Sequence, residues 1–237
     1  MTSVDPALLR DRARGCLLGQ FIGDSLGSLV EFETPEEIAE RYPDGVRDLA
    51  DGGTWNLIAG QPTDDSQMAM MLIRSLQRCG TFDANAVFVT GLVTGIRGGA
   101  AGEVVDAMEA AALERAVAQA IAAGRTGVVS AYEGHMGWVL LALSIAVRQL
   151  VLYDDPVEAL VDAVGMGGDT DTNAAIAGAL LGAVHGAVAW PERWVTGVLE
   201  CEPAEGRPGV ANPLGREFWA TGLLEQADEL AGTDYGE

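Results

Sequence analysis

Two short stretches of the sequence gather carboxylate and hydroxyl groups in front of apolar helical patterns. Residues 60–68 read Gly-Gln-Pro-Thr-Asp-Asp-Ser-Gln-Met, and residues 165–173 read Gly-Met-Gly-Gly-Asp-Thr-Asp-Thr-Asn. On a regular helix, Asp169 and Asp171 would lie about 200° apart, so a helical backbone would not direct both toward one point. A glycine-containing loop that tightens into a first helical turn can direct both inward. Oxygen side chains that converge in this way form a site for a hard cation.

A simpler interpretation is that one of these acids only caps the helix that follows, because Asp and Thr are favoured at that position. One cap needs one such residue, whereas residues 169–172 provide four in succession. If the two helix starts face each other, they bring together four carboxylates, which would repel one another strongly without cations between them. Two divalent cations would roughly cancel that charge. The pattern therefore favours a metal site over capping alone.

Three motifs, in this order, resemble the ADP-ribosylglycohydrolase family, and most closely its dinitrogenase reductase-activating branch. They are Gly-Asp-Ser-Leu-Gly-Ser-Leu-Val-Glu-Phe at residues 23–32 and the acidic stretches at residues 60–68 and 167–173. The resemblance covers residues 12–100 and 130–195. It implies an all-α fold, a compact orthogonal helical bundle with a central dinuclear site for two divalent cations, Mg or Mn. It also implies hydrolysis of an N- or O-glycosidic bond to ADP-ribose.

The resemblance assigns roles to individual side chains. The metal ligands that it implies are Thr63, Asp64, Asp65, Asp169, Asp171 and Thr172. Asp64 and Asp171 thereby belong to the catalytic centre, together with Glu31, which occupies the position of a functional glutamate on a mobile loop in the family. We expect Glu31 to act as a general acid–base or to order the attacking water; the alternative is an exposed loop acid. Asp24 is expected to brace the ligand loops.

A third region, residues 130–139, resembles the turn that lines the ADP-ribose pocket in the family. The substrate-binding residues expected there are Tyr132, Gly134, His135, Gly137 and Trp138. Backbone amides at the start of a helix suit a phosphate or a ribose. Tyr132 or Trp138 would pack against adenine or ribose. Because Trp138 opens an apolar helix, burial in the core is an equal alternative.

The region between about residues 97 and 130 departs from the family. Family members usually carry a longer segment there, with a Gly-Asn-Gly stretch, followed shortly by Met-Arg, that holds the diphosphate and ribose. This chain has an Ala-rich helical pattern instead. Three functions therefore stay open: an ADP-ribosyl hydrolase acting on protein side chains, with arginine-linked adducts as the leading hypothesis; a hydrolase of a smaller ribosyl or ADP-ribosyl compound; and a non-catalytic ADP-ribose-binding module.

Composition narrows the class of protein and its partners. A chain of 237 residues without a linker-like segment predicts one domain, residues 1–237. The formal charge of −21, with 35 acidic and 14 basic residues, argues against nucleic acid or an anionic membrane as a direct partner. We find no signal segment, transmembrane pattern or cysteine framework and expect a cytoplasmic protein. A monomer and a homo-oligomer are both compatible with the sequence.

Helical patterns run along the whole chain, without hairpin signals. Asp5-Pro6 predicts the start of a helix that ends near residues 23–27. Thr34-Pro35-Glu36-Glu37 is a capping box for a short helix before Pro43, and a long loop over residues 43–62 delivers Thr63. Further helices are expected at residues 65–79, 83–97, 102–123, 138–152, 156–164 and 171–189, from Pro191, and at 214–230. The helix at 171–189 would place His185 in its middle, as a core residue.

Overall fold

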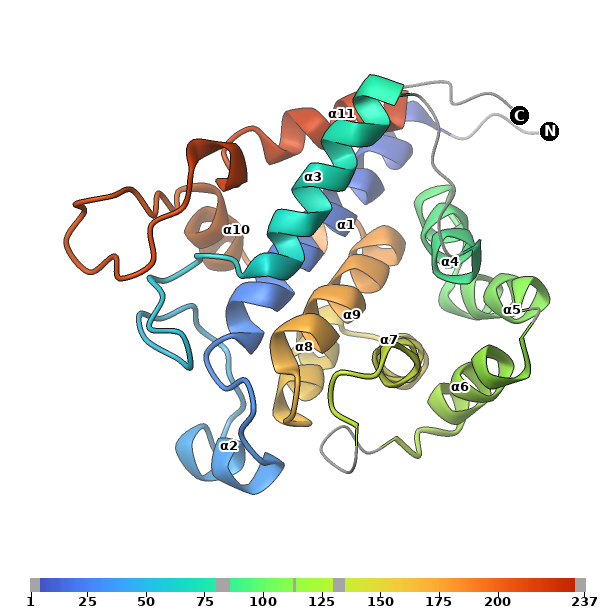
Figure 1. The fold of residues 1–237 in the computed structure, drawn as a ribbon. Coiled ribbons are helices and arrows are strands. Elements are labelled where there is room, and N and C mark those ends of the chain that lie inside the picture. The colour runs from blue at the N-terminus through green and yellow to red at the C-terminus, as the bar shows by residue number, and fades with distance from the viewer. Residues whose placement is uncertain (1–4, 80–85, 113, 130–134, 233–237) are drawn as a thin grey trace.

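Two antiparallel helices, α1 (Pro6–Gly27) and α9 (Thr170–His185), lie at the centre of the fold (Figure 1). The computed structural model describes residues 5–79, 86–112, 114–129 and 135–232. Both central helices are buried along most of their length, with Phe21 and Leu180 fully enclosed. The other helices form a layer around this pair.

Glycines allow α1 and α9 to approach each other closely. Four of them recur every four residues on α1, and so share one helix face: Gly15, Gly19, Gly23 and Gly27. A Cβ atom at Gly19 would lie 2.0 Å from the carbonyl oxygen of Gly178, and a Cβ atom at Gly178 would lie 2.0 Å from that of Gly19. The backbone of Gly27 touches Asp171 at the far end of the pair. The contact therefore places the end of α1 against the acidic start of α9.

The other helices cover the central pair on different sides (Figure 1). The helices α7 (Val139–Leu152) and α8 (Pro156–Gly165) pack on α9, whereas α11 (Leu223–Gly232) packs on α1. The helix α3 (Asp64–Cys79) contacts both central helices. The remaining helical elements are α2 (Pro35–Arg41), α4 (Ala86–Ile96), α5 (Ala101–Ala111), α6 (Arg115–Thr126), α10 (Glu192–Leu199) and the 3-10 turns η1 (Ala187–Ala189) and η2 (Arg216–Phe218).

The described residues contain no strand, only one isolated bridge between Gly52 and Leu57, so the all-α prediction is confirmed. Two predicted helix starts are confirmed by their caps. Asp5 accepts a hydrogen bond from the backbone N–H of Ala7 (2.9 Å). Thr34 and Glu37 form the capping box, with bonds of 3.2 and 2.9 Å. Within the described part of the chain, no helix combines the length and hydrophobicity that crossing a membrane requires.

Three predicted helix boundaries were wrong. The segment at residues 102–123 is two helices, because the chain turns at Ala112 so that α6 packs on α7. The helix predicted at 171–189 ends at His185, where Gly186 has a φ of 84°, so His185 is a half-buried terminal residue. The last helix begins at Leu223 and not at residue 214, because a 3-10 turn precedes it. Residue 83, the predicted start of the helix at residues 83–97, lies outside the described residues.

Candidate metal centre

The loop that follows α1 is tied to the loop that precedes α9. The backbone N–H of Phe32 donates to the carbonyl of Gly168 (2.7 Å), and the N–H of Gly168 donates to the carbonyl of Glu33 (3.1 Å). The hydroxyl of Thr170 adds a bond of 2.7 Å to the carbonyl of Gly27. These bonds fix the backbone of Glu31 beside the acidic turn of α9.

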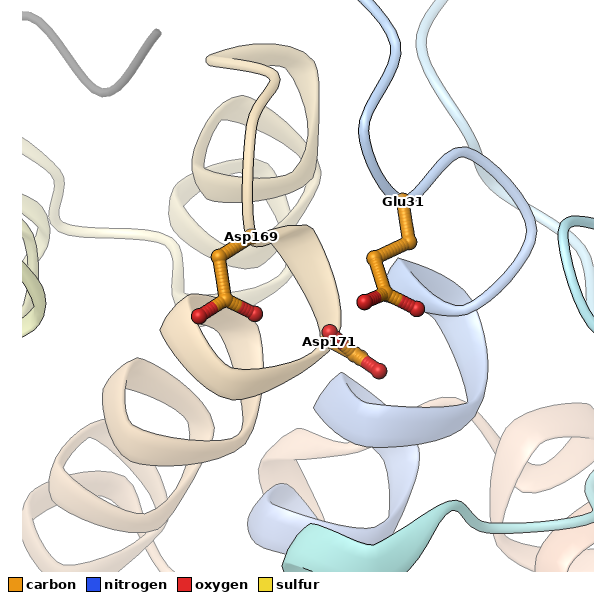
Figure 2. Close-up of side chains that lie close together, drawn as sticks. All are labelled: Glu31, Asp169 and Asp171. Atoms are coloured by element: carbon orange, nitrogen blue, oxygen red, sulfur yellow. The ribbon is translucent and has the colours of Figure 1, made fainter. Parts of the chain in front are cut away.

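Three carboxylates converge where these loops meet (Figure 2). Oxygen atoms of Glu31, Asp169 and Asp171 all lie within 4.8 Å of one another. Glu31 is 7% exposed and Asp171 is 4% exposed. Asp169 occupies the N-cap position of α9, yet its side chain makes no capping hydrogen bond. Capping alone therefore does not account for Asp169, and the geometry suits a cation with oxygen ligands.

The second acidic turn is held by Asp24, a buried residue of α1. Its carboxylate accepts hydrogen bonds from the backbone N–H of Thr63 (2.9 Å), the hydroxyl of Thr63 (2.8 Å) and the backbone N–H of Ser66 (3.0 Å). Because the Thr63 hydroxyl donates its proton to Asp24, its lone pairs stay available to a cation. The contact between Asp24 and this turn agrees with the bracing role expected from the sequence.

The two acidic turns meet directly. The hydroxyl of Thr172 donates to the Oδ2 atom of Asp65 (3.0 Å), which joins the start of α9 to the start of α3. Asp64, the first residue of α3, is exposed. Within the described residues, the tight group of acids contains neither Asp64 nor Asp65. The six residues expected as ligands thus lie at one junction, with Asp169 and Asp171 nearest to each other and to Glu31.

Burial and mutual repulsion raise the pKa values of these acids. Burial, and then the charges of Glu31 and Asp24, raise the pKa of Asp171 to about 9. Burial and the charge of Asp24 raise the pKa of Asp65 to about 7. For Asp24, burial raises the pKa to about 6 against the opposing hydrogen bonds from Ser66 and Thr63. Divalent cations would relieve the cost of ionising these groups together, so the residues present fit a metal centre.

The raised pKa values of these acids predict how the stability of the fold depends on pH. The pKa values of Asp24, Asp65 and Asp171 lie above the ordinary value of 3.8, so the folded state retains protons that the unfolded state releases. The contribution of these three groups to stability therefore falls as pH rises from about 4 toward about 9. We expect the thermal unfolding midpoint in EDTA to decrease from pH 5 to pH 8. Manganese should flatten this decrease, because it favours the ionised carboxylates.

Differential scanning calorimetry at constant ionic strength, with and without manganese, tests this expectation. Acids with lowered pKa values, such as Asp228, titrate below the window and do not affect it. If the midpoint in EDTA is constant or rises between pH 5 and pH 8, the buried acids of the cluster do not dominate the pH dependence of stability.

The turn before α7 lies against the acidic cluster. A Cβ atom at Gly137 would lie only 3.3 Å from the Oδ2 atom of Asp169. Trp138 is 54% exposed, which excludes its burial in the core, and His135 is also exposed. Trp138 lines a largely apolar cavity of about 300 Å³ together with Val128, Leu141 and neighbouring residues of α6 and α7. Tyr132 and Gly134, also expected at the substrate, lie outside the described residues.

Two features of the centre were not predicted from the sequence. Glu31 was expected as an acid–base group, but not as a direct neighbour of two expected ligands. The second is Trp55, whose indole N–H donates to the Glu31 carboxylate. Trp55 lies near a Gly-Gly pair in the loop over residues 43–62, and this sequence context does not predict a contact with Glu31.

Comparisons with known proteins show which family the sequence resembles. A family model described as ADP-ribosylglycohydrolase matches residues 5–93 and 84–232. Over 76 residues (32% of this chain), the sequence is 47% identical to the ADP-ribosyl-(dinitrogen reductase) glycohydrolase of Rhodospirillum rubrum. Over 97 residues (41% of this chain), it is 37% identical to the ADP-ribosylarginine hydrolase Tri1 of Pseudomonas putida (strain GB-1). These matches span 25% and 24% of the two relatives, about a quarter of each.

The fold also has a counterpart among solved structures. An ADP-ribosylglycohydrolase-related protein complex contains a chain that superposes with a TM-score of 0.71 and 21% identity. The superposition covers 95% of this chain and 97% of that one, which supports a common fold. The family model matches nearly the whole sequence, and the three motifs occur within the matched residues. The chain therefore belongs to the ADP-ribosylglycohydrolase family.

Proposed function

We propose that this protein is a metal-dependent hydrolase that cleaves the glycosidic bond between ADP-ribose and a protein side chain, with arginine as the leading leaving group. The observation that carries the proposal is the convergence of Glu31, Asp169 and Asp171 beside the turn that contains Thr63. The names of the two relatives, a dinitrogen reductase glycohydrolase and an ADP-ribosylarginine hydrolase, support this choice of substrate.

We infer that the centre binds two divalent cations, Mg²⁺ or Mn²⁺, through oxygen ligands. The residues that would hold them are Thr63, Asp64, Asp65, Asp169, Asp171 and Thr172. When bound, such cations polarise the groups they contact and lower the pKa of a coordinated water. The described arrangement supports this role because the ligand turns meet through the bond between Thr172 and Asp65.

The remaining steps belong to side chains of the protein. Glu31 is placed to orient a water molecule and to accept its proton during attack on the anomeric carbon. Burial raises the pKa of Glu31 against opposing hydrogen bonds from Trp55 and Asp171, and a raised pKa makes a carboxylate a stronger base. Carboxylate oxygens beside the ribose would favour the positive charge that develops on it in an oxocarbenium-like transition state.

The exposed turn before α7 would receive the substrate. A side chain at residue 137 would crowd the Asp169 carboxylate, so glycine keeps this side of the centre open. Trp138 offers an exposed aromatic surface to an adenine or a ribose, at the edge of the apolar cavity. His135 precedes this turn and is exposed on the same segment.

A second candidate is a hydrolase of a smaller ribosyl or ADP-ribosyl compound. It is favoured by the absence of a Gly-Asn-Gly stretch from the sequence. The segment that stands in its place includes the helix α5, which carries Glu103, Asp106 and Glu109 and no basic residue.

Incubation with an ADP-ribosylated arginine peptide and manganese tests the proposal. We expect free ADP-ribose to be released, and EDTA to abolish the release. A peptide ADP-ribosylated on serine and free ADP-ribosylarginine serve as parallel substrates, with ADP-ribose quantified by chromatography. Cleavage of the free compound without cleavage of either peptide would favour the second candidate. Binding of ADP-ribose, measured by calorimetry, without cleavage of any substrate would indicate a binding module.

A further inference from the structure

Trp55 lies on a short, rigid loop that faces the acidic centre. Backbone hydrogen bonds between Gly52 and Leu57, of 2.7 and 2.8 Å, close the loop at its base. The backbone N–H of Thr54 donates to the carbonyl of Ser28 (3.2 Å), and the loop backbone at Gly53 packs directly on Leu29. The loop is therefore fastened to the segment that carries Glu31.

Two contacts from this loop end on Glu31 itself. The hydroxyl of Thr54 donates to the carbonyl oxygen of Glu31 (2.8 Å), and the indole N–H of Trp55 donates to its Oε2 atom. The other hydrogen-bonding partner of that carboxylate is Asp171, which is itself an acid. Trp55 thus supplies an N–H donor, which cannot itself become negatively charged, to a carboxylate that lies beside Asp169 and Asp171.

The neighbouring aromatic residue supports this geometry. Phe32 has a φ of 67°, which is unusual for a bulky residue, and its ring meets Trp55 edge-on at a centroid distance of 6.4 Å. Trp55 is 50% exposed, so burial of apolar surface does not explain why its N–H faces inward. The side chain amide of Asn212 holds the Trp55 carbonyl from the opposite side (2.7 Å).

We propose that Trp55 is a positioning residue, which holds the Glu31 carboxylate in place beside Asp169 and Asp171 through its indole N–H. The inference deepens the proposed function, because Glu31 is the acid–base group of that mechanism. Without the donor, repulsion from the neighbouring carboxylates turns Glu31 out of the cluster. Trp55 then acts on the chemistry without touching the substrate.

The test measures binding of Mn²⁺ alone, by calorimetry, to the full chain. Trp55→Phe keeps a ring and removes the N–H. It is expected to raise the Mn²⁺ dissociation constant, because Glu31 then leaves the group of acids, with Asp169 and Asp171, that could hold the ion. The expected rise is about tenfold, the size expected for one hydrogen bond to a charged group. In a Glu31→Ala background, the same substitution should change that constant less than about twofold, because the two residues act through one contact.

Asn212→Ala is the matched control, since it removes one hydrogen bond to the Trp55 backbone but keeps the indole N–H, and the backbone bonds of Gly52, Thr54 and Leu57 still hold the loop. Its Mn²⁺ dissociation constant should stay within about twofold of the original. A Trp55→Phe effect below twofold, an effect that persists in the Glu31→Ala background, or an equal effect of Asn212→Ala would overturn the proposal. Thermal unfolding in EDTA verifies that each variant is folded.

Kinetics separates this inference from the proposed function. If the protein hydrolyses an ADP-ribosylated peptide, Trp55→Phe should lower kcat about tenfold and leave KM within about twofold, because the substrate is bound elsewhere. A change confined to KM would instead place Trp55 at the substrate and contradict a positioning role. If no substrate is cleaved, the Mn²⁺ titrations still decide whether Trp55 and Glu31 are coupled.

Discussion

Replacement of Asp171 by Asn is expected to reduce kcat/KM for an ADP-ribosylated arginine peptide by about 1000-fold. Asn has nearly the same shape as Asp but cannot supply the negative charge that a divalent cation requires. Asp171 is buried and adjacent to both Glu31 and Asp169, so no exposed acid can take its place. Initial rates of ADP-ribose release at saturating manganese measure the effect.

The same substitution should have the opposite effect on the metal-free protein. Because burial and neighbouring charges raise the pKa of Asp171 to about 9, its ionised form is unfavourable in the fold. Asp171→Asn is therefore expected to raise the thermal midpoint in EDTA while it removes the stabilisation by manganese. Glu205→Gln, which removes an exposed acid, is the control and should change neither quantity. A variant that is less stable in EDTA and still stabilised by manganese would exclude Asp171 as a ligand.

The second large effect is expected at the contact between the central helices. A methyl group at Gly19 would lie 2.0 Å from the carbonyl oxygen of Gly178 and 2.7 Å from the ring of Trp190. Two backbones cannot yield as a flexible side chain does, so Gly19→Ala must push α1 and α9 apart. We expect a loss of about 3 kcal/mol in the free energy of unfolding, measured by urea denaturation. The thermal midpoint should fall by about 6–12 °C.

A glycine elsewhere provides the matched control. Gly102 lies in α5, and a Cβ atom there would meet nothing within 4 Å. Gly102→Ala should therefore leave stability unchanged or raise it by up to about 1 kcal/mol, because alanine is the better helix former. Equal losses for the two substitutions would show that the close contact at Gly19 has no special energetic role.

Local signals predicted much of the fold. Asp5, Thr34 and Asp155 each cap the helix that their position before a proline indicates, because a cap is an interaction over two or three residues. The break between α5 and α6 carries no proline or glycine, and it arises from packing of α6 on α7. Arg125 of α6 then pairs with Glu109 of α5 (2.7 Å).

The candidate centre was predictable where residue type alone carried the signal. The two acidic turns contain more oxygen side chains than caps require, and the bond between Thr172 and Asp65 confirms that the turns meet. The partners of Glu31 were not predictable, because they depend on the path of two loops. The spacing of residues in the sequence does not predict that Trp55 lies beside Glu31. That contact depends on how the loop packs on Leu29.

The bond between Thr170 and Gly27 joins residues 143 positions apart, and it has a consequence for how the protein acquires its centre. Contacts between such distant residues form slowly during folding. A long chain segment must first be closed into a loop, which costs conformational entropy before the contact contributes any stability. In the unfolded chain the expected metal ligands are therefore far apart, and they do not form a metal-binding site. Metal ions that bind only the native state should therefore lower the rate of unfolding and leave the rate of folding nearly unchanged.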